Sequence, residues 1–436
     1  MHINTLQARI YYMKKIFIVM IAILIILLLI DLVAWKAMMH LLQQSTPFTR
    51  NLSKWMYWGI SLFFLALIVS VFLSSTGQRD PKTTSRIFLL AGIMLALYIP
   101  KLFFAVFHLT EDIGKLAALG IHKLSALVAG TETSPDSSAE KISRFRFLTQ
   151  AGLILSAIPF LSIIWGMVWG RFRFRISHQK LAFPHLPEAF HGLKIVQISD
   201  IHIGSFYGYE KKVTEAVKMI NSLEADLIVF TGDMINDLAE ELNGWEEIFA
   251  SLQAPLGKYS ILGNHDYGDY FRWDSEQDKR NNLQELIRRQ EAMGFRMLLN
   301  EAVQIEKNRS TLALIGVENW GKPPFAQYGD FRKAHENVKD APFKILLSHD
   351  PTHWDAEIMG KTNVDLTLSG HTHGMQFGIE TQNIKWSPVQ WKYPHWAGLY
   401  RENKQYLYVN RGFGYIGYPG RVGMPPEITI IELLRG

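Results

Sequence analysis

Five short polar clusters in the C-terminal half of the chain combine histidine with carboxylate or amide side chains. They are Asp200-Ile-His202, Gly232-Asp233, Gly263-Asn264-His265-Asp266, Ser348-His349 and Gly370-His371-Thr372-His373. Imidazole and carboxylate together bind first-row divalent metals, whereas an oxygen-only set suits calcium or magnesium. A carboxylate can also bridge two ions about 3.5 to 4 Å apart, the spacing used in phosphoryl transfer. The clusters therefore predict a site for two divalent metal ions.

Each cluster taken singly is weak evidence for a metal site. A Gly-Asp pair after a strand is commonly a turn, and a lone histidine is more often a hydrogen-bonded core or surface residue than a ligand. Burying five such clusters in an ordinary hydrophobic core would cost free energy without a functional gain, because buried polar groups need hydrogen-bond or metal partners. The metal-site interpretation is therefore favoured over coincidence.

The clusters lie at the ends of apolar runs in a segment with an α/β pattern. Past Lys180, short β-branched runs alternate with amphipathic segments. We expect strands at 193–200, 226–230, 258–262, 312–317, 343–347, 364–368, 405–409 and 428–433, and helices at 210–223, 239–252 and 281–293. An α/β sheet usually places its site at the ends of its strands, where the five clusters stand.

The N-terminal part is hydrophobic enough to span a membrane four times. Apolar runs occupy about 16–34, 55–73, 87–107 and 147–169, and about 19 residues at 1.5 Å each cross a hydrocarbon core of roughly 30 Å. The first run is longer than a signal peptide requires and lacks a small-residue cleavage site, so we expect a retained anchor. The predicted organisation is an all-α membrane region, 1–175, followed by an α/β domain, 176–436.

Two details of the membrane region carry expectations of their own. Asp31 is the single charge of the first run. It is either a functional intramembrane charge or, as we expect from its position within a turn or two of the interface, a charge that reaches water. After the third run we expect a loop from Thr110 to Arg146, which begins with an apolar, partly helical stretch along the membrane surface and continues as a flexible linker.

Charge and cysteine content restrict the partners. The net charge of +5 fits a basic belt beside the membrane better than nucleic-acid binding, and the absence of cysteine excludes disulfides and thiolate ligands. Basic residues are nearly balanced on the two sides of the predicted spans. The RFRFR segment at 171–175 favours a cytoplasmic domain on a bacterial inner or plasma membrane.

In this order, the five clusters resemble the calcineurin-like metallophosphoesterase superfamily, whose signature runs D-x-H, G-D, G-N-H-D/E, H and G-H-x-H. The resemblance covers about 194–434. The segments FPHLPEAFHGLKIVQISDIH and VNRGFGYIGYPGRVGMPPEITIIEL look like the membrane-associated bacterial branch typified by YaeI and YkuE. The resemblance implies a four-layer αββα sandwich and a metal-dependent phosphoric ester hydrolase.

The resemblance also implies a role for each residue of the motifs. Metal ligands would be Asp200, His202 and His373 at the first ion, Asp233 between both ions, and Asn264, His349 and His371 at the second. His265 would be catalytic, either by hydrogen bonding to the substrate phosphate or by protonating the leaving oxygen, because imidazole titrates near neutral pH. The ions would be Mn, Fe, Zn or Mg, and a metal-activated water would attack phosphorus.

Neighbouring polar residues leave two readings open. Asp266 and Asp350 are either orienting partners of the imidazoles or turn and cap aspartates. Arg411 and Arg421 either bind a substrate phosphate or are surface arginines near glycine-rich turns. The segment 232–237, GDMIND, lacks the G-D-x-x-D-R-G of serine/threonine protein phosphatases, which argues against that activity.

The substrate is expected from location. About ten residues separate the last span from the domain, which favours a lipid-linked phosphate. Members of the resembling branch are associated with phosphodiester or pyrophosphate cleavage, including the UDP-diacylglucosamine step of the lipid A pathway. The alternative is a metal-binding sensor or interaction module coupled to the helices. A transporter is disfavoured because the spans contain almost no polar residues.

Overall fold

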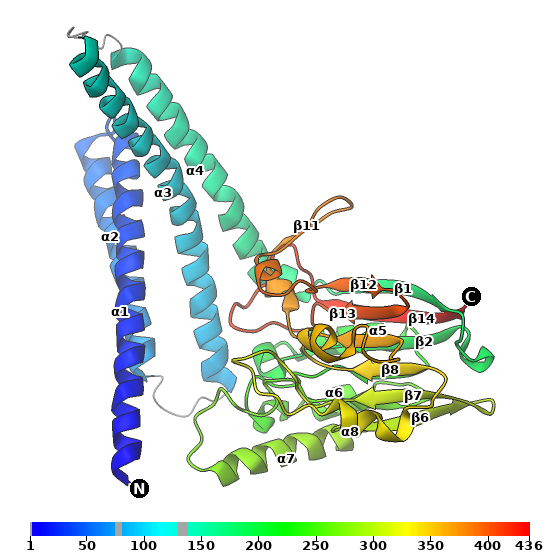
Figure 1. The fold of residues 1–436 in the computed structure, drawn as a ribbon. Helices are drawn as coiled ribbons and strands as arrows, with labels where there is room; N and C mark the ends of the chain where they lie inside the picture. Colours follow the sequence, from blue (N-terminus) through cyan, green and yellow to red (C-terminus); the bar gives the residue numbers. More distant parts are fainter. Residues whose placement is uncertain (1, 75–80, 130–137) are drawn as a thin grey trace. The chain divides into compact units, whose positions relative to one another are not determined.

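The computed structural model describes residues 2–74, 81–129 and 138–436. These residues fall into two compact units (Figure 1). The helical unit comprises Met1–Gly77 and Gly92–Ile164, and the α/β unit comprises Gln78–Ala91 and Trp165–Gly436. The boundary predicted at residue 175 stays a prediction.

Four long helices are long and apolar enough to cross a membrane. They are α1 (His2–Leu41), α2 (Pro47–Ser74), α3 (Pro81–Ala129) and α4 (Ser138–Val168). Their candidate spans are Phe17–Met39, Pro47–Val71, Lys82–Ile121 and Gln150–Phe172, and each overlaps one predicted run. The stretch after Thr110 is helical, as expected in part, but the expectation of a separate loop was wrong, because this stretch continues α3 to Ala129. Of the predicted linker, residues 131–137 lie outside the described residues, and the prediction was wrong for 138–141, which begin α4.

Asp31 does not reach water. Its side chain is fully buried among α1, α2 and α3, where it accepts hydrogen bonds from Tyr57, Ser61 and Tyr98 and lies 2.7 Å from Lys101 Nζ. The expectation of a hydrated Asp31 was wrong, because a partner 70 positions away supplies the compensating charge. A charged side chain inside a membrane-spanning bundle is tolerated when it forms an ion pair and its remaining oxygen lone pairs accept hydrogen bonds.

Replacing Lys101 with methionine should therefore destabilise the helical unit by about 3 kcal/mol, because the Asp31 carboxylate would be left buried without a cation. The measurement is unfolding of the full chain by SDS in mixed micelles. The matched control is Lys36→Met: Lys36 pairs with Asp112 at 2.6 Å, but its side chain is 57% exposed, so at most about 1 kcal/mol is expected. Equal stability losses in both variants would contradict the compensating role of Lys101.

The α/β unit contains two six-stranded mixed sheets. The first has the order β1-β14-β2-β3-β4-β5, and the second has the order β12-β13-β9-β8-β7-β6. In the first, β2 to β5 are parallel and β14 runs antiparallel to β2. In the second, β7, β8, β9 and β13 are parallel. The strands are β1 (Arg175–Phe183), β2 (Leu193–Ile198), β3 (Leu227–Phe230), β4 (Lys258–Ser260), β5 (Phe295–Met297), β6 (Glu301–Lys307), β7 (Ser310–Gly316), β8 (Lys344–Leu347), β9 (Leu366–Ser369), β12 (Gly398–Glu402), β13 (Gln405–Val409) and β14 (Glu427–Arg435).

The two sheets pack face to face, with helices on their outer faces, which confirms the predicted αββα sandwich (Figure 1). Strand alternation explains the layers. Leu227 and Val229 of β3 face the core between the sheets, whereas Ile228 and Phe230 face the helices α5 to α7. A third core lies between the second sheet and α8. The helices are α5 (Glu210–Asn221), α6 (Glu246–Ala250), α7 (Glu276–Ala292) and α8 (Phe331–His335).

Short elements complete the unit. A small antiparallel hairpin is formed by β10 (Ile379–Glu380) and β11 (Lys385–Trp386). One-turn helices of the 3-10 type are η1 (Gly170–Phe172), η2 (Glu188–Phe190), η3 (Ile203–Phe206), η4 (Ala239–Leu242), η5 (Glu336–Val338), η7 (His373–Gln376) and η8 (Pro388–Trp391), and η6 (Trp354–Ile358) is a π-helix.

The prediction of one continuous helix at 239–252 was wrong. The chain forms η4 and then α6, separated at Gly244, whose φ of +83° is outside the helical region. β1 was not predicted, because its first residue, Arg175, belongs to the basic segment 171–175 and the α/β pattern begins only past Lys180. Arg171 of that segment bonds to the hydroxyl groups of Tyr209 and Tyr415 inside the α/β unit.

Candidate metal centre

The five polar clusters meet at one end of the sandwich. Each follows the carboxyl end of a parallel strand: β2, β3 and β4 in the first sheet, and β8 and β9 in the second. Because parallel strands end at the same edge, residues up to 173 positions apart come together. All seven predicted metal ligands lie in this cluster, and His265 lies beside them.

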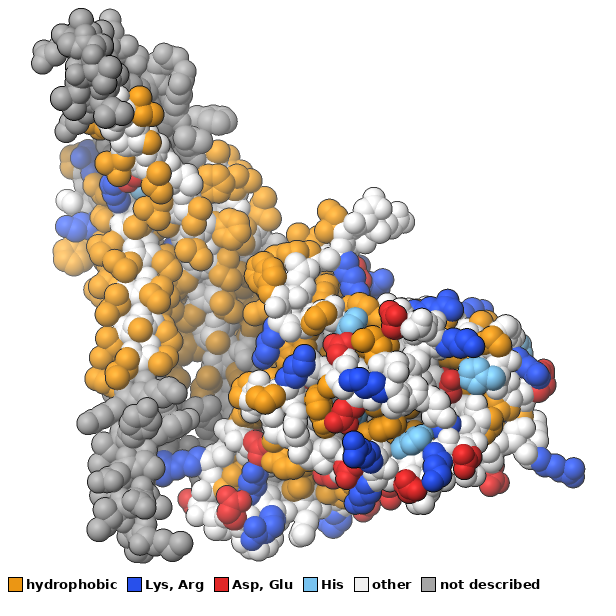
Figure 2. Space-filling view, viewed as in Figure 1, with side chains coloured by type: hydrophobic (Ala, Val, Ile, Leu, Met, Phe, Trp, Pro, Cys, Tyr) orange, Lys and Arg blue, Asp and Glu red, His pale blue; other side chains and the backbone are white. Residues whose placement is uncertain are grey.

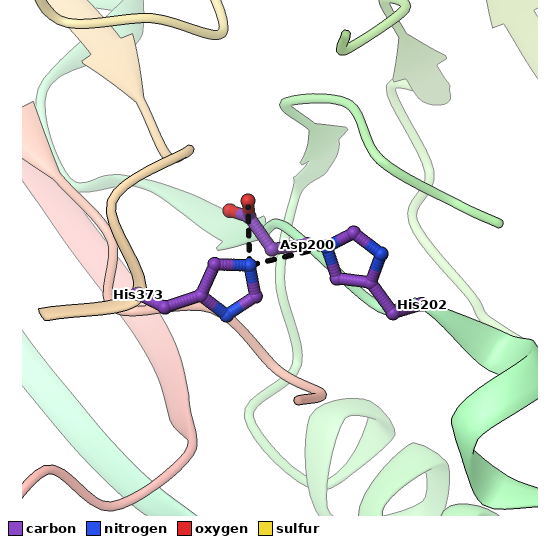
Figure 3. Close-up of side chains that lie close together, drawn as sticks. All are labelled: Asp200, His202 and His373. Carbon is purple, nitrogen blue, oxygen red and sulfur yellow. Dashed lines mark hydrogen bonds and ion pairs between the residues drawn. The ribbon is translucent and has the colours of Figure 1, made fainter. Parts of the chain in front are cut away.

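One group consists of Asp200, His202 and His373 (Figure 3). His202 Nε2 lies 3.1 Å from His373 Nε2, and His373 Nε2 lies 3.3 Å from Asp200 Oδ1. All three side chains are buried. Their ligand atoms point at one another, as Figure 3 shows, so they could contact a single ion.

A second group is centred on His349. Its Nε2 lies 3.2 Å from Asp233 Oδ2 and 3.2 Å from Asn264 Oδ1, and Asn264 Oδ1 lies 2.8 Å from His371 Nδ1. Asp233 Oδ2 is also 3.5 Å from His202 Nε2. One oxygen of Asp233 therefore faces both groups, the position that a bridging carboxylate requires.

The donor set fits divalent ions. Ligand atoms about 2.1 Å from one ion lie about 3.0 Å apart at right angles and about 3.4 Å apart at tetrahedral angles, close to the separations between these nitrogens and oxygens. His349 Nδ1 lies 2.7 Å from the carbonyl oxygen of Thr231. That carbonyl can only accept, so Nδ1 carries a proton, and Nε2 is the nitrogen that would bind an ion in place of a second proton.

The electrostatics of the cluster also favour bound cations. Burial lowers the pKa of His349, but the carboxylates of Asp233 and Asp200 outweigh it and raise the pKa to about 10. Burial opposes ionisation of Asp200, yet His373 and His349 hold its pKa below the ordinary value. The buried carboxylates therefore recruit positive charge, which a proton on His349 or a metal ion can supply.

Strained backbone aims the ligands. Asp200, His202, Asp233, His371 and His373 all have φ between +48° and +72°, in the left-handed region that non-glycine residues rarely adopt. Such strain concentrates at functional sites, where the surrounding structure holds it in place. A Cβ on Gly232 would lie 2.5 Å from Gly263 N and 2.9 Å from His349 Nδ1, so the clusters approach too closely for a side chain there.

His265 lies beside the two groups. Its ring is 5.0 Å from that of His202, its backbone N–H donates to Asp233 Oδ1, and its Nδ1 lies 2.7 Å from the carbonyl oxygen of Asn236. Nδ1 therefore carries a proton, and Nε2 is the atom left for a substrate. Burial lowers the pKa of His265 below its ordinary value, so neutral imidazole dominates near pH 7.

Asp266 and Asp350 hold the loops. Asp266 accepts hydrogen bonds of 2.8 Å from the backbone N–H groups of Asp233, Met234 and Gly263, so it organises the turns that carry the ligands. Burial and the Asp233 carboxylate raise the pKa of Asp266 to about 7. Asp350 accepts from the backbone and hydroxyl of Thr352, and its other oxygen lies 3.5 Å from His371 Nε2.

Of the two readings left open for Arg411 and Arg421, the surface one was wrong, because both side chains are buried. Arg411 is buried between Glu427 and Glu380. Arg421 is 1% exposed and donates to the carbonyl groups of Gly412, Gly414 and Met424, with its Nη2 3.3 Å from His373 Nδ1. Both guanidinium groups bond within the protein, one of them beside a predicted ligand.

Two tyrosines at the site were not predicted. Tyr393 Oη lies 2.8 Å from His371 Nε2, and Tyr270 Oη accepts a bond of 3.0 Å from the Asn264 side-chain amide. Burial raises the pKa of Tyr270 to about 12. Neither residue follows an apolar run directly, so the strand-end pattern that revealed the other residues gave no signal for these two.

Comparisons with known proteins agree with this geometry. Residues 13–171 match the family described as probable calcineurin-like phosphoesterase, transmembrane domain, and residues 193–375 match calcineurin-like phosphoesterase. A Danio rerio transmembrane protein with metallophosphoesterase domain is 28% identical over 86% of this chain and 79% of its own length. The uncharacterized metallophosphoesterase YkuE of Bacillus subtilis is 32% identical over 57% of this chain and 81% of its own length.

A third relative has a named reaction. UDP-2,3-diacylglucosamine pyrophosphatase LpxG of Chlamydia muridarum is 30% identical over 64% of this chain and 94% of its own length. The apolar helices and the transmembrane family match together make the chain a membrane protein. The chain belongs to the membrane-associated branch of the calcineurin-like metallophosphoesterases and is a metal-dependent phosphoric ester hydrolase.

Proposed function

We propose that the chain hydrolyses a phosphodiester or pyrophosphate bond of a lipid-linked substrate with two divalent ions. The observation that carries the dinuclear site is the position of Asp233 Oδ2, which lies 3.5 Å from His202 Nε2 in one ligand group and 3.2 Å from His349 Nε2 in the other. Asp200, His202 and His373 hold the first ion, and Asn264, His349 and His371 hold the second. The mixed nitrogen and oxygen ligands suit Mn, Fe, Zn or Mg.

The chain's own residues position the reacting groups. When bound, divalent ions polarise phosphoryl oxygens and activate water. Asp233 holds the two ligand groups together and, through the His265 backbone N–H, sets the position of the His265 ring. When the ring is protonated at both nitrogens, His265 Nε2–H either donates a hydrogen bond to a phosphoryl oxygen or transfers its proton to the leaving oxygen. The His265 ring is held by its Nδ1–H bond to Asn236, so it has little orientational freedom to lose on reaction.

Two observations support a lipid-linked substrate. The similarity to LpxG extends over 94% of that relative, which is named for hydrolysis of UDP-2,3-diacylglucosamine. The end of the fourth candidate span, from Trp165 on, belongs to the same compact unit as the ligand clusters. A lipid phosphate at the bilayer surface would then need to move little to reach the site. We place the protein in a bacterial plasma membrane, with the α/β unit on the cytoplasmic side because of the basic segment 171–175.

The test is hydrolysis by the full chain in detergent, first stripped with a chelator and then given each divalent metal in turn. The substrates are bis-p-nitrophenyl phosphate, p-nitrophenyl phosphate and UDP-diacylglucosamine. We expect no turnover without metal, recovery with metal, and the highest kcat/KM for the lipid pyrophosphate, because its two acyl chains concentrate it in the same micelle.

Each outcome decides a different part of the proposal. Cleavage of the aryl diester without cleavage of UDP-diacylglucosamine would remove this lipid substrate and leave the phosphoesterase. Binding of two ions without turnover of any of the three substrates would favour the sensor or interaction module. Binding of one ion per chain in an active sample would contradict the dinuclear site.

A further inference from the structure

The segment that follows His373 exposes large apolar side chains. Met375, Ile379, Ile384 and Trp391, here called the apolar lip, are 57%, 53%, 55% and 78% exposed. Beyond Trp169, the only other exposed large hydrophobic residues among those the structure describes are three tyrosines and Leu399. Single exposed apolar residues are normal, but a group confined to one short segment marks an interaction site.

The lip lies on and around the β10–β11 hairpin. Ile379 pairs with Trp386 across the hairpin, and the Trp386 ring lies 6.2 Å from that of Trp391. Figure 1 shows the hairpin, drawn in orange, extending beyond the two sheets, and hydrophobic side chains gather at its base in Figure 2. The lip therefore projects from the α/β unit as a small apolar edge.

The charges around the lip are those of a membrane-interface segment. Lys385 and Lys392 are exposed in the same segment, and the Lys392 ammonium lies over the rings of Phe325 and Tyr393. The acidic residue of the hairpin, Glu380, is paired with Arg175 and Arg411. Tryptophan beside lysine is the composition found at the headgroup level of bilayers, where the rings are amphipathic and the lysines attract anionic lipids.

Backbone hydrogen bonds join this segment to the end of a membrane span. Arg421 N–H donates to the carbonyl of Gly166, near the end of α4. The next residue, Val422, donates to Gln376 and accepts from Gly378. A Cβ on Gly166 would lie 2.8 Å from Val422, so the contact is close-packed.

The distance from the span to the lip follows from these bonds. Two lateral steps of hydrogen-bonded backbone, at about 4.8 Å each, keep the base of the hairpin within about 10 Å of Gly166. All of these residues belong to one compact unit. Trp165 and Trp169, at the same end of α4, are 41% and 61% exposed.

We infer that the apolar lip inserts into the interface of the bilayer in which the helices are anchored. Apolar side chains of an amphipathic segment bury at the boundary between headgroups and acyl chains, while their lysines stay with the headgroups. Met375 is two residues from His373, and Tyr393 contacts His371, so this insertion holds the metal centre beside the membrane surface. The lip would do so for any phosphoester substrate, so the inference does not depend on the lipid-linked one.

The absence of cysteine from the chain allows a direct test. Ile384→Cys places a single thiol on the lip, and Gln304→Cys places one on an exposed position of β6, at the opposite edge of the second sheet from β12. Each full-length variant is labelled with NBD, reconstituted into vesicles of phosphatidylcholine and phosphatidylglycerol, and quenched by nitroxide-labelled lipid. We expect severalfold stronger quenching and a blue-shifted emission at position 384, but not at position 304.

Equal, weak quenching at both positions would overturn the inference. A second measurement keeps the result specific to the lip: adding Ile379→Asp and Trp391→Asp to the Ile384→Cys chain should reduce its quenching to the level of position 304. Quenching unchanged by these two charges would also overturn the inference, because the label alone would then be entering the bilayer. Hydrolysis is not read out, so these results are independent of the proposed substrate.

Discussion

Replacing Asp233 with asparagine is expected to lower the rate of phosphoester hydrolysis by about a thousandfold at saturating metal, because a metal centre supplies several kcal/mol of charge stabilisation and each 1.36 kcal/mol is tenfold. Asparagine keeps the acceptor for the His265 backbone N–H but loses the charge that faces His202 and His349. The measurement is kcat for bis-p-nitrophenyl phosphate, with bound metal counted on the same samples. We expect fewer than two ions per chain.

The matched control is Asp365→Asn. Asp365 is also largely buried, and it accepts a hydrogen bond from the backbone N–H of Lys344. It lies just before the first residue of β9, whereas the ligand cluster lies after the last residue of this strand. We expect kcat and metal content to stay close to those of the unaltered chain. An Asp233→Asn protein with two bound ions and undiminished kcat would show that this carboxylate does not bridge them.

Replacing His265 with alanine is expected to lower kcat by about a hundredfold to ten-thousandfold for a substrate with an alkyl leaving group, the range typical of positioned proton donors. His265 is not among the proposed ligands, so both ions should stay bound. The measurement is a comparison of alkyl and p-nitrophenyl phosphodiesters in the same preparation. His178→Ala, on an exposed face of β1, is the control and should leave kcat unchanged.

The leaving group separates the two roles open to His265. A proton donor matters little for p-nitrophenolate, which leaves readily as an anion, so the loss should be much smaller for the aryl diester. A residue that only binds the phosphate would cause equal losses for both substrates. No loss for either substrate would contradict a catalytic His265.

The pH profile has a defined sign. Burial lowers the pKa of His265, so its protonated form is depleted as the pH rises through that lowered value. If His265 donates the proton, alkyl-ester turnover falls over the same range in the unaltered chain, and this descending limb is absent from His265→Ala.

The candidate site could be predicted from the sequence to an unusual degree. Strand propensity and hydrophobic patterning are local, and each motif follows its strand within a few residues. Clusters after β2, β3, β4, β8 and β9 must therefore meet once those strands run parallel. Hydropathy is also a local property of the sequence, so the four membrane-spanning helices could be predicted without knowing which helices pack against one another.

Tertiary contacts decided what local patterns could not express. The burial of Asp31 could not be predicted without its ion-pair partner Lys101, which is 70 positions away. The burial of Arg411 likewise depends on its ion pairs with Glu427 and Glu380. β1 pairs with β14, about 250 residues later in the chain, and its own sequence, which starts at the basic segment 171–175, did not predict a strand. In each case the free energy of burying a charge or an edge strand depends on a group that is distant in sequence.

The sequence by itself determined the metal-binding residue types, their positions at strand ends and the membrane anchoring, because these depend on composition and short-range periodicity. Only the tertiary structure decided that Asp233 faces both ligand groups, that Tyr270 and Tyr393 contact Asn264 and His371, and that the apolar lip projects near the end of α4. The physical reason is that side-chain direction and exposure are set by packing between elements, which no stretch of sequence contains alone.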